Sequence, residues 1–300
     1  RLENIVEQLD ICKKSLADFL DGRRRQFPRY YFTSESDLLD ILSNGSSPEK
    51  VLKHTAKVFL STKTLLLDKN EFTPSGRPYA TAWVSGVGSE DVEFEPKVPL
   101  EGKVEIYHQT ILDAMKISLF KCMQRSLIRY HEMGRGDWIM HKVESKLQKS
   151  IVPADPAQVT LVVLAVNYVA EVEETFNDIE KGNRLGLTQY SSKQIDQLKE
   201  LIRLTQTKLS KGDRTRVMVC ITMDAHGRDI VLKMIRENVT EVTSFQWQSQ
   251  LKHKYREPPS NASFVNRDLH LRGPGKERAE VAICDAIMPY DYEYLGNGPS

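Results

Sequence analysis

The sequence predicts a mainly α protein made of helical bundles, with a small inserted β-meander and a short C-terminal β-sheet. Apolar residues recur at three- and four-residue steps through most of the chain, which is the spacing of amphipathic helices. Short alternating runs between turn residues replace this spacing near residues 64–100 and again after residue 249. Proline and glycine separate the helical runs, as expected where helices end.

The composition is that of a folded protein with a balanced surface. Hydrophobic residues make up 40% of the 300 residues, which is enough for one large domain or two ordinary ones. The 42 basic and 41 acidic residues leave a net charge of +1, which gives no electrostatic footprint for nucleic acid or an anionic membrane.

The cysteines indicate free thiols in a reducing compartment such as the cytoplasm. They are widely spaced and form no Cys-x-x-Cys pair, which argues against a zinc site and a disulfide framework: Cys12, Cys122, Cys220 and Cys284. The most apolar run, residues 159–170, is shorter than a membrane span. We expect no signal peptide, and we expect the chain to be a fragment of a longer protein.

The clearest helical pattern covers residues 2–26. Its apolar positions define one face of an amphipathic helix: Leu2, Val6, Leu9, Cys12, Leu16, Phe19 and Leu20. Pro28 disfavours a helical conformation at Phe27, so the helix is expected to end there. The aromatic residues that follow are predicted to lie on an extended segment and to form a structural corner between two helices. The corner comprises Phe27, Pro28, Arg29, Tyr30, Tyr31 and Phe32.

A short helix is predicted over residues 37–43, and Asn44-Gly45 ends it. Ser47 and Pro48 suit the N-cap and the first position of the next helix. Three short strands follow, separated by turns rich in glycine, serine and proline, and Pro96 and Pro99 are expected to end the insert. The predicted strands cover residues 64–67, 79–84 and 92–94.

Helices are predicted over residues 103–133 and 138–150, with Gly134-Arg135-Gly136-Asp137 as the break between them. Pro153 marks a further break. Residues 159–170 are compatible with a buried strand or a buried helix, and their acidic continuation favours the helix.

The last third of the chain continues with helices and then strands. Ser191 and Gln194 match a capping box, which predicts a helix beginning there. Another helix is predicted over residues 214–238. The strands are predicted over residues 250–255, 264–269 and 280–287.

The sequence contains no recognisable catalytic or nucleotide-binding motif. Gly275-Lys276 resembles the end of a phosphate-binding loop, but His270 stands at the first glycine position and Glu277 at the hydroxyl position. Asp224 and His226 are two positions apart on a predicted helix, and such residues do not face each other. We therefore expect no enzymatic activity, metal or cofactor in this chain.

Two motifs near opposite ends of the chain carry a family resemblance. The corner residues 27–32, followed by Asp37-Leu38-Leu39-Asp40-Ile41-Leu42, resemble the linker region of dynein heavy chains. Residues 292–297 resemble the segment where that linker enters the first AAA+ ATPase module. The resemblance extends over residues 2–297, and residues 40–45 are more similar to axonemal than to cytoplasmic heavy chains. It implies candidate residues for attachment to the ring: Tyr290, Tyr292, Tyr294, Leu295, Gly296 and Asn297.

The resemblance implies an elongated stack of helical bundles. The expected domains are a helical bundle with the corner (1–63), the β-meander (64–100), further helical bundles (101–248), a C-terminal sheet (249–289) and the connection to the first module (290–300). Ala165, Val166 and Asn167 stand where many relatives carry bulky aromatic residues, a departure that leaves the local packing open. The breaks in the helical pattern supply hinge candidates: Asn44, Gly45, Gly134, Gly136 and Pro153.

The implied function is that of a mechanical lever. A dynein linker bends and straightens over the AAA+ ring as ATP turns over, and so drives movement along microtubules. ATP and Mg would then belong to the ring of the parent chain, a microtubule motor ATPase. The implied partners are that ring, the microtubule and other dynein subunits, without nucleic acid or membrane. The implied location is the cytoplasm and its cytoskeleton, in the axoneme of a cilium or flagellum. The alternative is a helical scaffold that binds partner proteins without producing force.

Overall fold

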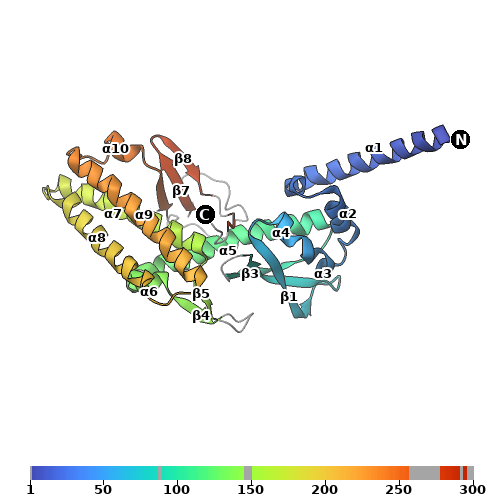
Figure 1. Ribbon diagram of the computed structural model, residues 1–300, viewed down its shortest axis with the longest axis horizontal. Coiled ribbons are helices and arrows are strands. Elements are labelled where there is room, and N and C mark those ends of the chain that lie inside the picture. The colour runs from blue at the N-terminus through green and yellow to red at the C-terminus, as the bar shows by residue number, and fades with distance from the viewer. Residues whose placement is uncertain (1, 87–89, 145–150, 257–277, 291–292, 296–300) are drawn as a thin grey trace. The chain divides into compact units, whose positions relative to one another are not determined.

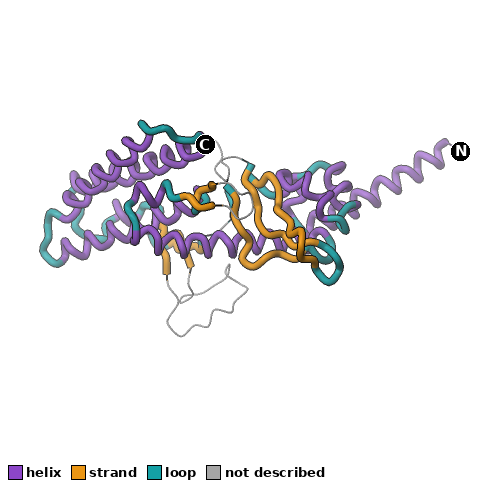
Figure 2. The backbone as a smooth tube through the Cα atoms, turned by 90° about the horizontal axis from the view of Figure 1, so that it is seen from below, coloured by secondary structure: helices purple, strands orange, loops and turns teal. Residues whose placement is uncertain are grey.

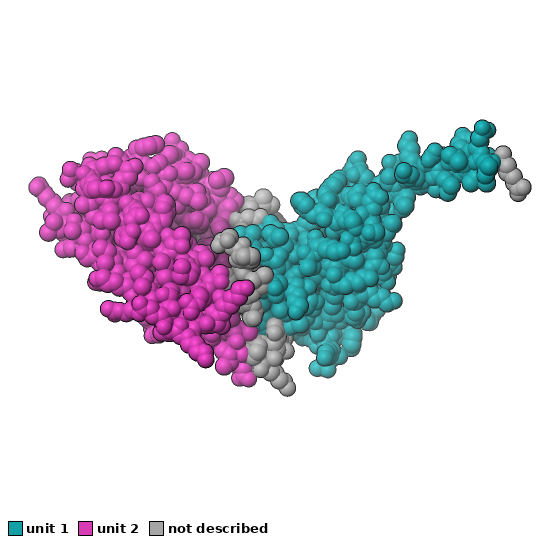
Figure 3. Space-filling view, viewed as in Figure 1, with its two compact units in different colours: residues 1–118, 293–298 teal, residues 119–292, 299–300 magenta. Residues whose placement is uncertain are grey.

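The computed structural model describes residues 2–86, 90–144, 151–256, 278–290 and 293–295. The chain forms two compact units (Figure 3). Unit 1 comprises residues 1–118 and 293–298, and unit 2 comprises residues 119–292 and 299–300. One long helix, α5 (Val104–Glu132), contributes its first half to unit 1 and its second half to unit 2.

The prediction of a mainly α fold with small β parts is confirmed. Helices dominate the described residues, and three small antiparallel sheets accompany them (Figure 2). In the described ranges, no helix is both long enough and apolar enough to cross a membrane.

Unit 1 begins with the predicted long helix, α1 (Leu2–Gln26; Figure 1). The next residues form a 3₁₀ helix, η1 (Pro28–Phe32), so the prediction of an extended segment is wrong. Pro28 occupies the first position of η1. A backbone N–H at that position would have no acceptor within the helix, so proline, which lacks the N–H, is tolerated there. Four short helices follow: α2 (Glu35–Ser43), α3 (Pro48–Val51), η2 (Leu52–His54) and α4 (Thr55–Val58).

The apolar face of α1 is exposed along most of its length. Leu2 is 79% exposed, and Leu9 and Phe19 are also exposed, whereas Leu20 is buried. The main contacts of α1 are to η1 and α2, and these reach only its C-terminal end. Within the described residues, the rest of the apolar stripe therefore has no helix to pack against.

The β-meander of unit 1 has longer strands than the alternation predicted. β1 (Thr62–Phe72), β2 (Pro78–Ser85) and β3 (Asp91–Pro99) pair antiparallel in the order β1-β2-β3. Trp83 on β2 is fully buried, and its ring centroid lies 4.9 Å from that of Phe94 on β3. β3 continues through Pro96 and ends at Pro99, so Pro96 does not end the insert as predicted.

The segment that follows α5 in unit 2 differs from the prediction of a helix over residues 138–150. The helix α6 (Arg135–Ile139) ends early, and β4 (Lys142–Glu144) pairs with β5 (Ile151–Pro153). Two causes account for the difference. The Trp138 ring packs edge-on against Tyr130 at 5.1 Å, which anchors a short turn. Val143 and Ile151 are β-branched and suit strands.

Three long helices lie side by side in unit 2 (Figure 1): α7 (Ala157–Glu180), α8 (Gly186–Thr205) and α9 (Lys211–Arg236). The run 159–170 is helical, as its acidic continuation predicted. The predicted capping box is wrong because α8 begins at Gly186 and Ser191 lies buried inside it. Glycine permits this early start, since a Cβ at position 186 would lie 3.3 Å from the Thr175 carbonyl oxygen.

The C-terminal sheet follows the short helix α10 (Phe245–Gln248). Its strands β6 (Lys252–Arg256), β7 (Arg278–Ile283) and β8 (Ala286–Pro289) pair in that order, and β6 lies against α7. The single strand predicted over residues 280–287 is two strands, because Cys284 adopts a φ of 46° and turns the chain. The strand predicted over residues 264–269 lies outside the described residues.

Candidate functional site

Two of the corner aromatics are buried together. The Phe27 ring packs edge-on against Tyr30 with a centroid distance of 4.9 Å, and Phe59 and His108 complete the cluster at 6.3 and 5.7 Å from Phe27. Phe27 and Tyr30 are at most 1% exposed. The cluster holds η1 against α4 and α5, which is the role of a corner between helices.

A buried polar pair lies at the centre of this cluster. The Tyr30 hydroxyl and His108 Nδ1 are 2.9 Å apart and hydrogen-bonded. Burial lowers the pKa of His108 to about 3, so its imidazole is neutral in the folded protein. Burial also raises the pKa of Tyr30, with the Glu105 carboxylate as a further cause. Near pH 7 the hydrogen bond therefore joins two uncharged groups.

The other corner aromatics point away from the core. Tyr31 is 56% exposed and Phe32 is 86% exposed. The Tyr31 hydroxyl donates to Asp21 Oδ1 over 3.1 Å, and the Arg24 guanidinium lies 6.0 Å from the Tyr31 ring centroid. Tyr31 therefore ties η1 back to the end of α1 at the surface.

Side-chain contacts hold the C-terminal segment Glu293–Leu295 against the rest of unit 1. The Tyr294 hydroxyl donates to Glu90 Oε2 over 3.0 Å in a buried hydrogen bond. Its ring packs edge-on against Trp83 at 5.5 Å. Glu293 forms an ion pair with Arg29, which belongs to the corner. Unit 1 thus brings the corner and two residues of the last described segment together.

The remaining attachment candidates do not share the surroundings of Tyr294. Tyr290 belongs to unit 2, where its hydroxyl accepts from Gln158 Nε2 over 3.2 Å. Leu295 is 55% exposed. Three of the candidates lie outside the described residues: Tyr292, Gly296 and Asn297.

Two hinge candidates lie just after α2. Asn44 is the C-cap of α2, and its Nδ2 donates to the Asp40 carbonyl over 2.9 Å. Gly45 lies close to α5, since a Cβ there would be 3.2 Å from the Val104 Cβ. The Tyr107 hydroxyl donates to the Gly45 carbonyl over 3.2 Å. A side chain at position 45 would therefore require Val104 to shift by a few tenths of an ångström.

The other hinge candidates lie in unit 2. Gly134 is the N-cap of α6, and Pro153 ends β5. The Gly136 N–H donates to Glu200 Oε1 over 3.2 Å, and a Cβ at Gly136 would lie 2.4 Å from the same atom. The hinge role of all five residues stays a prediction. The boundary between the units falls between Ser118 and Leu119, at none of them.

Sequence reasoning missed the partners of the C-terminal segment. Glu90 lies 204 positions before Tyr294, and no local pattern connects positions so far apart. An acidic residue next to a turn, such as Glu90, does not by itself predict a buried hydrogen bond to a distant tyrosine. His108 was missed because a single histidine in a helical stripe is most often a packing residue.

The described residues therefore define a mainly helical structural segment. Its two well-packed features are the aromatic corner at residues 27–32 and the side-chain contacts of residues 293–295 with unit 1. Among them, no group of three or more histidine, cysteine, aspartate or glutamate residues is arranged to hold a metal ion.

Comparisons with known proteins identify the family. A family model described as "Dynein heavy chain, N-terminal region 2" matches residues 1–126. The chain is 38% identical over 298 residues, 99% of its length, to the dynein alpha chain of the flagellar outer arm of Chlamydomonas reinhardtii. It is 35% identical over its full length to the ciliary dynein beta chain of Tripneustes gratilla and to dynein axonemal heavy chain 9 of Homo sapiens.

The chain belongs to the dynein heavy chain family, which confirms the resemblance seen in its sequence. The relatives named above are all flagellar, ciliary or axonemal chains. The chain spans about 6% of the length of each of them.

Proposed function

We propose that this chain is part of the mechanical linker of an axonemal dynein heavy chain. The observation that carries the proposal is the similarity to flagellar, ciliary and axonemal heavy chains along 99% or more of the chain. The parent chain is then a microtubule motor ATPase whose AAA+ ring binds ATP and Mg. Its partners are that ring, the microtubule and other dynein subunits, in the axoneme of a cilium or flagellum.

The structure supports a lever physically. A lever needs stiff parts, and the long helices α5, α7, α8 and α9 supply them. It also needs a firm connection at its driven end. The buried Tyr294–Glu90 hydrogen bond and the Glu293–Arg29 ion pair fasten the C-terminal segment to unit 1. In the proposed lever, the exposed stripe of α1 packs against further helices of the heavy chain.

Resonance energy transfer on the parent heavy chain tests this proposal. A fluorescent donor is fused at the start of α1, and an acceptor is placed on the ring. A lever predicts that transfer changes between the nucleotide-free motor and the motor trapped with ATP and vanadate. Constant transfer, in a motor whose ATPase turns over normally, would favour the scaffold alternative.

A further inference from the structure

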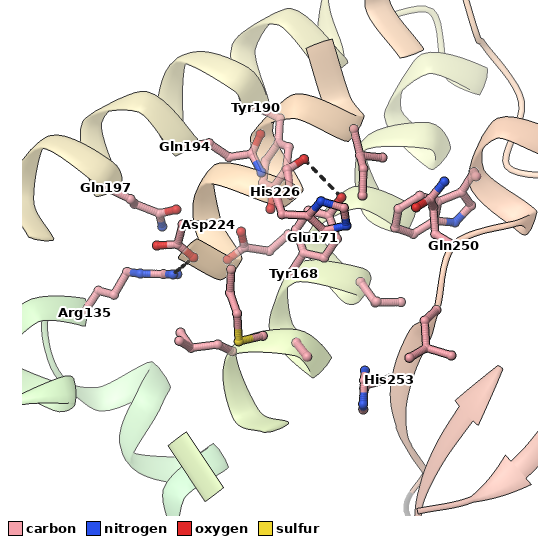
Figure 4. Close-up of a pocket in the computed structure, with 18 residues that line it drawn as sticks. Arg135, Tyr168, Glu171, Tyr190, Gln194, Gln197, Asp224, His226, Gln250 and His253 are labelled. Atoms are coloured by element: carbon pink, nitrogen blue, oxygen red, sulfur yellow. Dashed lines mark hydrogen bonds and ion pairs between the residues drawn. The ribbon is translucent and has the colours of Figure 1, made fainter. Parts of the chain in front are cut away.

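Unit 2 contains a cavity of about 250 Å³ that the proposed lever function does not use (Figure 4). It lies between α7, α8, α9 and the segment that runs from α10 into β6. Aliphatic side chains form much of its wall, and Ala165 leaves room on the α7 side. The volume is smaller than the roughly 300–1,000 Å³ of pockets for drug-sized ligands, so it suits a group of side-chain size.

Aromatic rings form a second part of the wall: Tyr168, Tyr190 and Trp247. Two of these rings already attract cations of the chain itself. Lys193 Nζ lies 5.9 Å from the Tyr190 ring centroid, and Lys252 Nζ lies 5.9 Å from that of Trp247. Tyr168 is held in place because its hydroxyl donates to the Gly227 carbonyl over 3.2 Å. Electron-rich ring faces of this kind attract ammonium and guanidinium groups.

Hydrogen-bond acceptors without donors form a third part. Asp224 forms an ion pair with Arg135 through Oδ1, whereas its Oδ2 is buried with no donor in the described part of the chain. Gln194 is 5% exposed, and its Oε1 is likewise buried without a donor there. Burial raises the pKa of Asp224, although Arg135 opposes the shift. A second cationic donor would satisfy this carboxylate.

The charges that face the cavity are of both signs. Its ionic lining consists of Asp224, Glu171 and Arg135, together with His226 and His253. Burial lowers the pKa of His253, which keeps that ring neutral. Glu171 accepts from the Tyr190 hydroxyl (Figure 4) and pairs with Lys193 over 3.0 Å. Two carboxylates and one guanidinium line the cavity, and Arg135 Nε and Trp247 Nε1 are buried there without an acceptor in the described part of the chain. The preference for a cation therefore rests on the aromatic faces and on the open acceptors of Asp224 and Gln194.

We propose that this cavity binds a guanidinium or alkylammonium group carried on an apolar stem. The stem packs on the aliphatic wall, the charged head lies against the aromatic faces, and its N–H groups donate to Asp224 and Gln194. The terminal torsions of aspartate and glutamine are broad, so small rotations present both oxygens to the ligand. The group can be an arginine or lysine side chain of a partner protein, or a free amine.

Calorimetric titration of the 300-residue chain with n-butylguanidinium chloride tests the proposal. The matched neutral probe is n-butylurea, which has a similar shape without the charge. We expect saturable binding of the guanidinium and weaker or no binding of the urea. Equal binding of both probes, or no binding of the guanidinium, overturns the proposal.

Three variants locate the binding site. Asp224→Asn removes the charge at the cavity, and Ala165→Leu fills space without changing charge. Asp229→Asn removes a charge from an exposed position of α9 and is the control. We expect each cavity variant to weaken binding about tenfold or more, Asp224→Asn because it loses one charge-assisted hydrogen bond and Ala165→Leu because it occupies the space of the stem. The control is expected to bind as the wild type does.

Circular dichroism establishes which variants fold. If Asp224→Asn does not fold, the comparison rests on Ala165→Leu. Undiminished binding by a folded cavity variant overturns the proposal. The peptide acetyl-Ala-Ala-Arg-Ala-Ala-amide distinguishes the sources: tighter binding than n-butylguanidinium supports a protein partner, and weaker binding supports a free amine.

Discussion

The corner aromatics illustrate how one backbone conformation selects which side chains are buried. In an extended segment, alternate residues share a face, which would place Phe27 on the same face as Tyr31 and opposite to Tyr30. In the observed 3₁₀ helix, residues three positions apart are eclipsed, and Phe27 therefore meets Tyr30. Tyr31 is left at the surface. The composition of the corner was predictable from sequence, but its buried pair was not.

Replacing Phe27 with alanine is expected to destabilise the protein by ~3–5 kcal/mol, because a buried phenylalanine loses its packing and leaves a cavity. Phe32→Ala is the matched control, since Phe32 is 86% exposed and its loss should change stability little. Urea denaturation measures both. Similar unfolding free energies for the two variants would show that the corner is not part of the core.

The buried His108 is expected to make the free energy of unfolding depend on pH. Its folded pKa of about 3 lies below the ordinary value near 6.5, so the unfolded chain binds the proton more tightly. The stabilising effect is complete above about pH 6.5 and is lost progressively as the pH falls toward 3. Between pH 7 and pH 5 the unfolding free energy should decrease by about 2 kcal/mol from this group. His108→Gln should remove that decrease, and an equally steep decrease in the variant would contradict the assignment.

At the level of elements, long periodic segments were predictable and short ones were not. The helices α1 and α5 follow from periodicity, because each repeats one pattern over many residues. The helix α7 was favoured by the acidic continuation of an apolar run, and the meander strands were predicted shorter than they are. The β4–β5 pair and the start of α8 depend on tertiary contacts, such as the close packing of Gly186 on α7. The exposure of the apolar face of α1 could not be predicted for a related reason, since periodicity defines a face and not what packs on it.

Two glycines at helix positions should respond oppositely to alanine. No atom lies within 4 Å of a Cβ at Gly22 in α1, so Gly22→Ala should stabilise that helix by roughly 0.5–1 kcal/mol through propensity. At Gly186, a Cβ would lie 3.1 Å from Thr175 Cγ2, and overpacking of this kind typically costs about 1–3 kcal/mol. Thermal unfolding monitored by circular dichroism compares the two. A higher melting temperature for Gly186→Ala would contradict this, because it would show that Thr175 and Ile179 make room for the added methyl group.

For the whole molecule, the attachment candidates divide between the two units. Tyr290 belongs to unit 2, whereas residues 293–295 belong to unit 1. The family motif indicated the segment, but not its anchor, because Glu90 and Trp83 are remote in sequence. In the proposed lever, the contacts of Tyr294 with Glu90 and Trp83 transmit movement between residues 293–295 and the rest of unit 1.

Microtubule gliding by the full-length heavy chain, with ATPase turnover measured in parallel, tests this claim most directly. The variant carries Glu293→Gln and Tyr294→Phe, which remove the ion pair with Arg29 and the hydrogen bond to Glu90. Leu60→Ala is the control at an exposed position of unit 1 that is not an attachment candidate. The account predicts slower gliding with ATP turnover retained in the variant, and normal gliding in the control. Gliding at the wild-type speed in the double variant would contradict it.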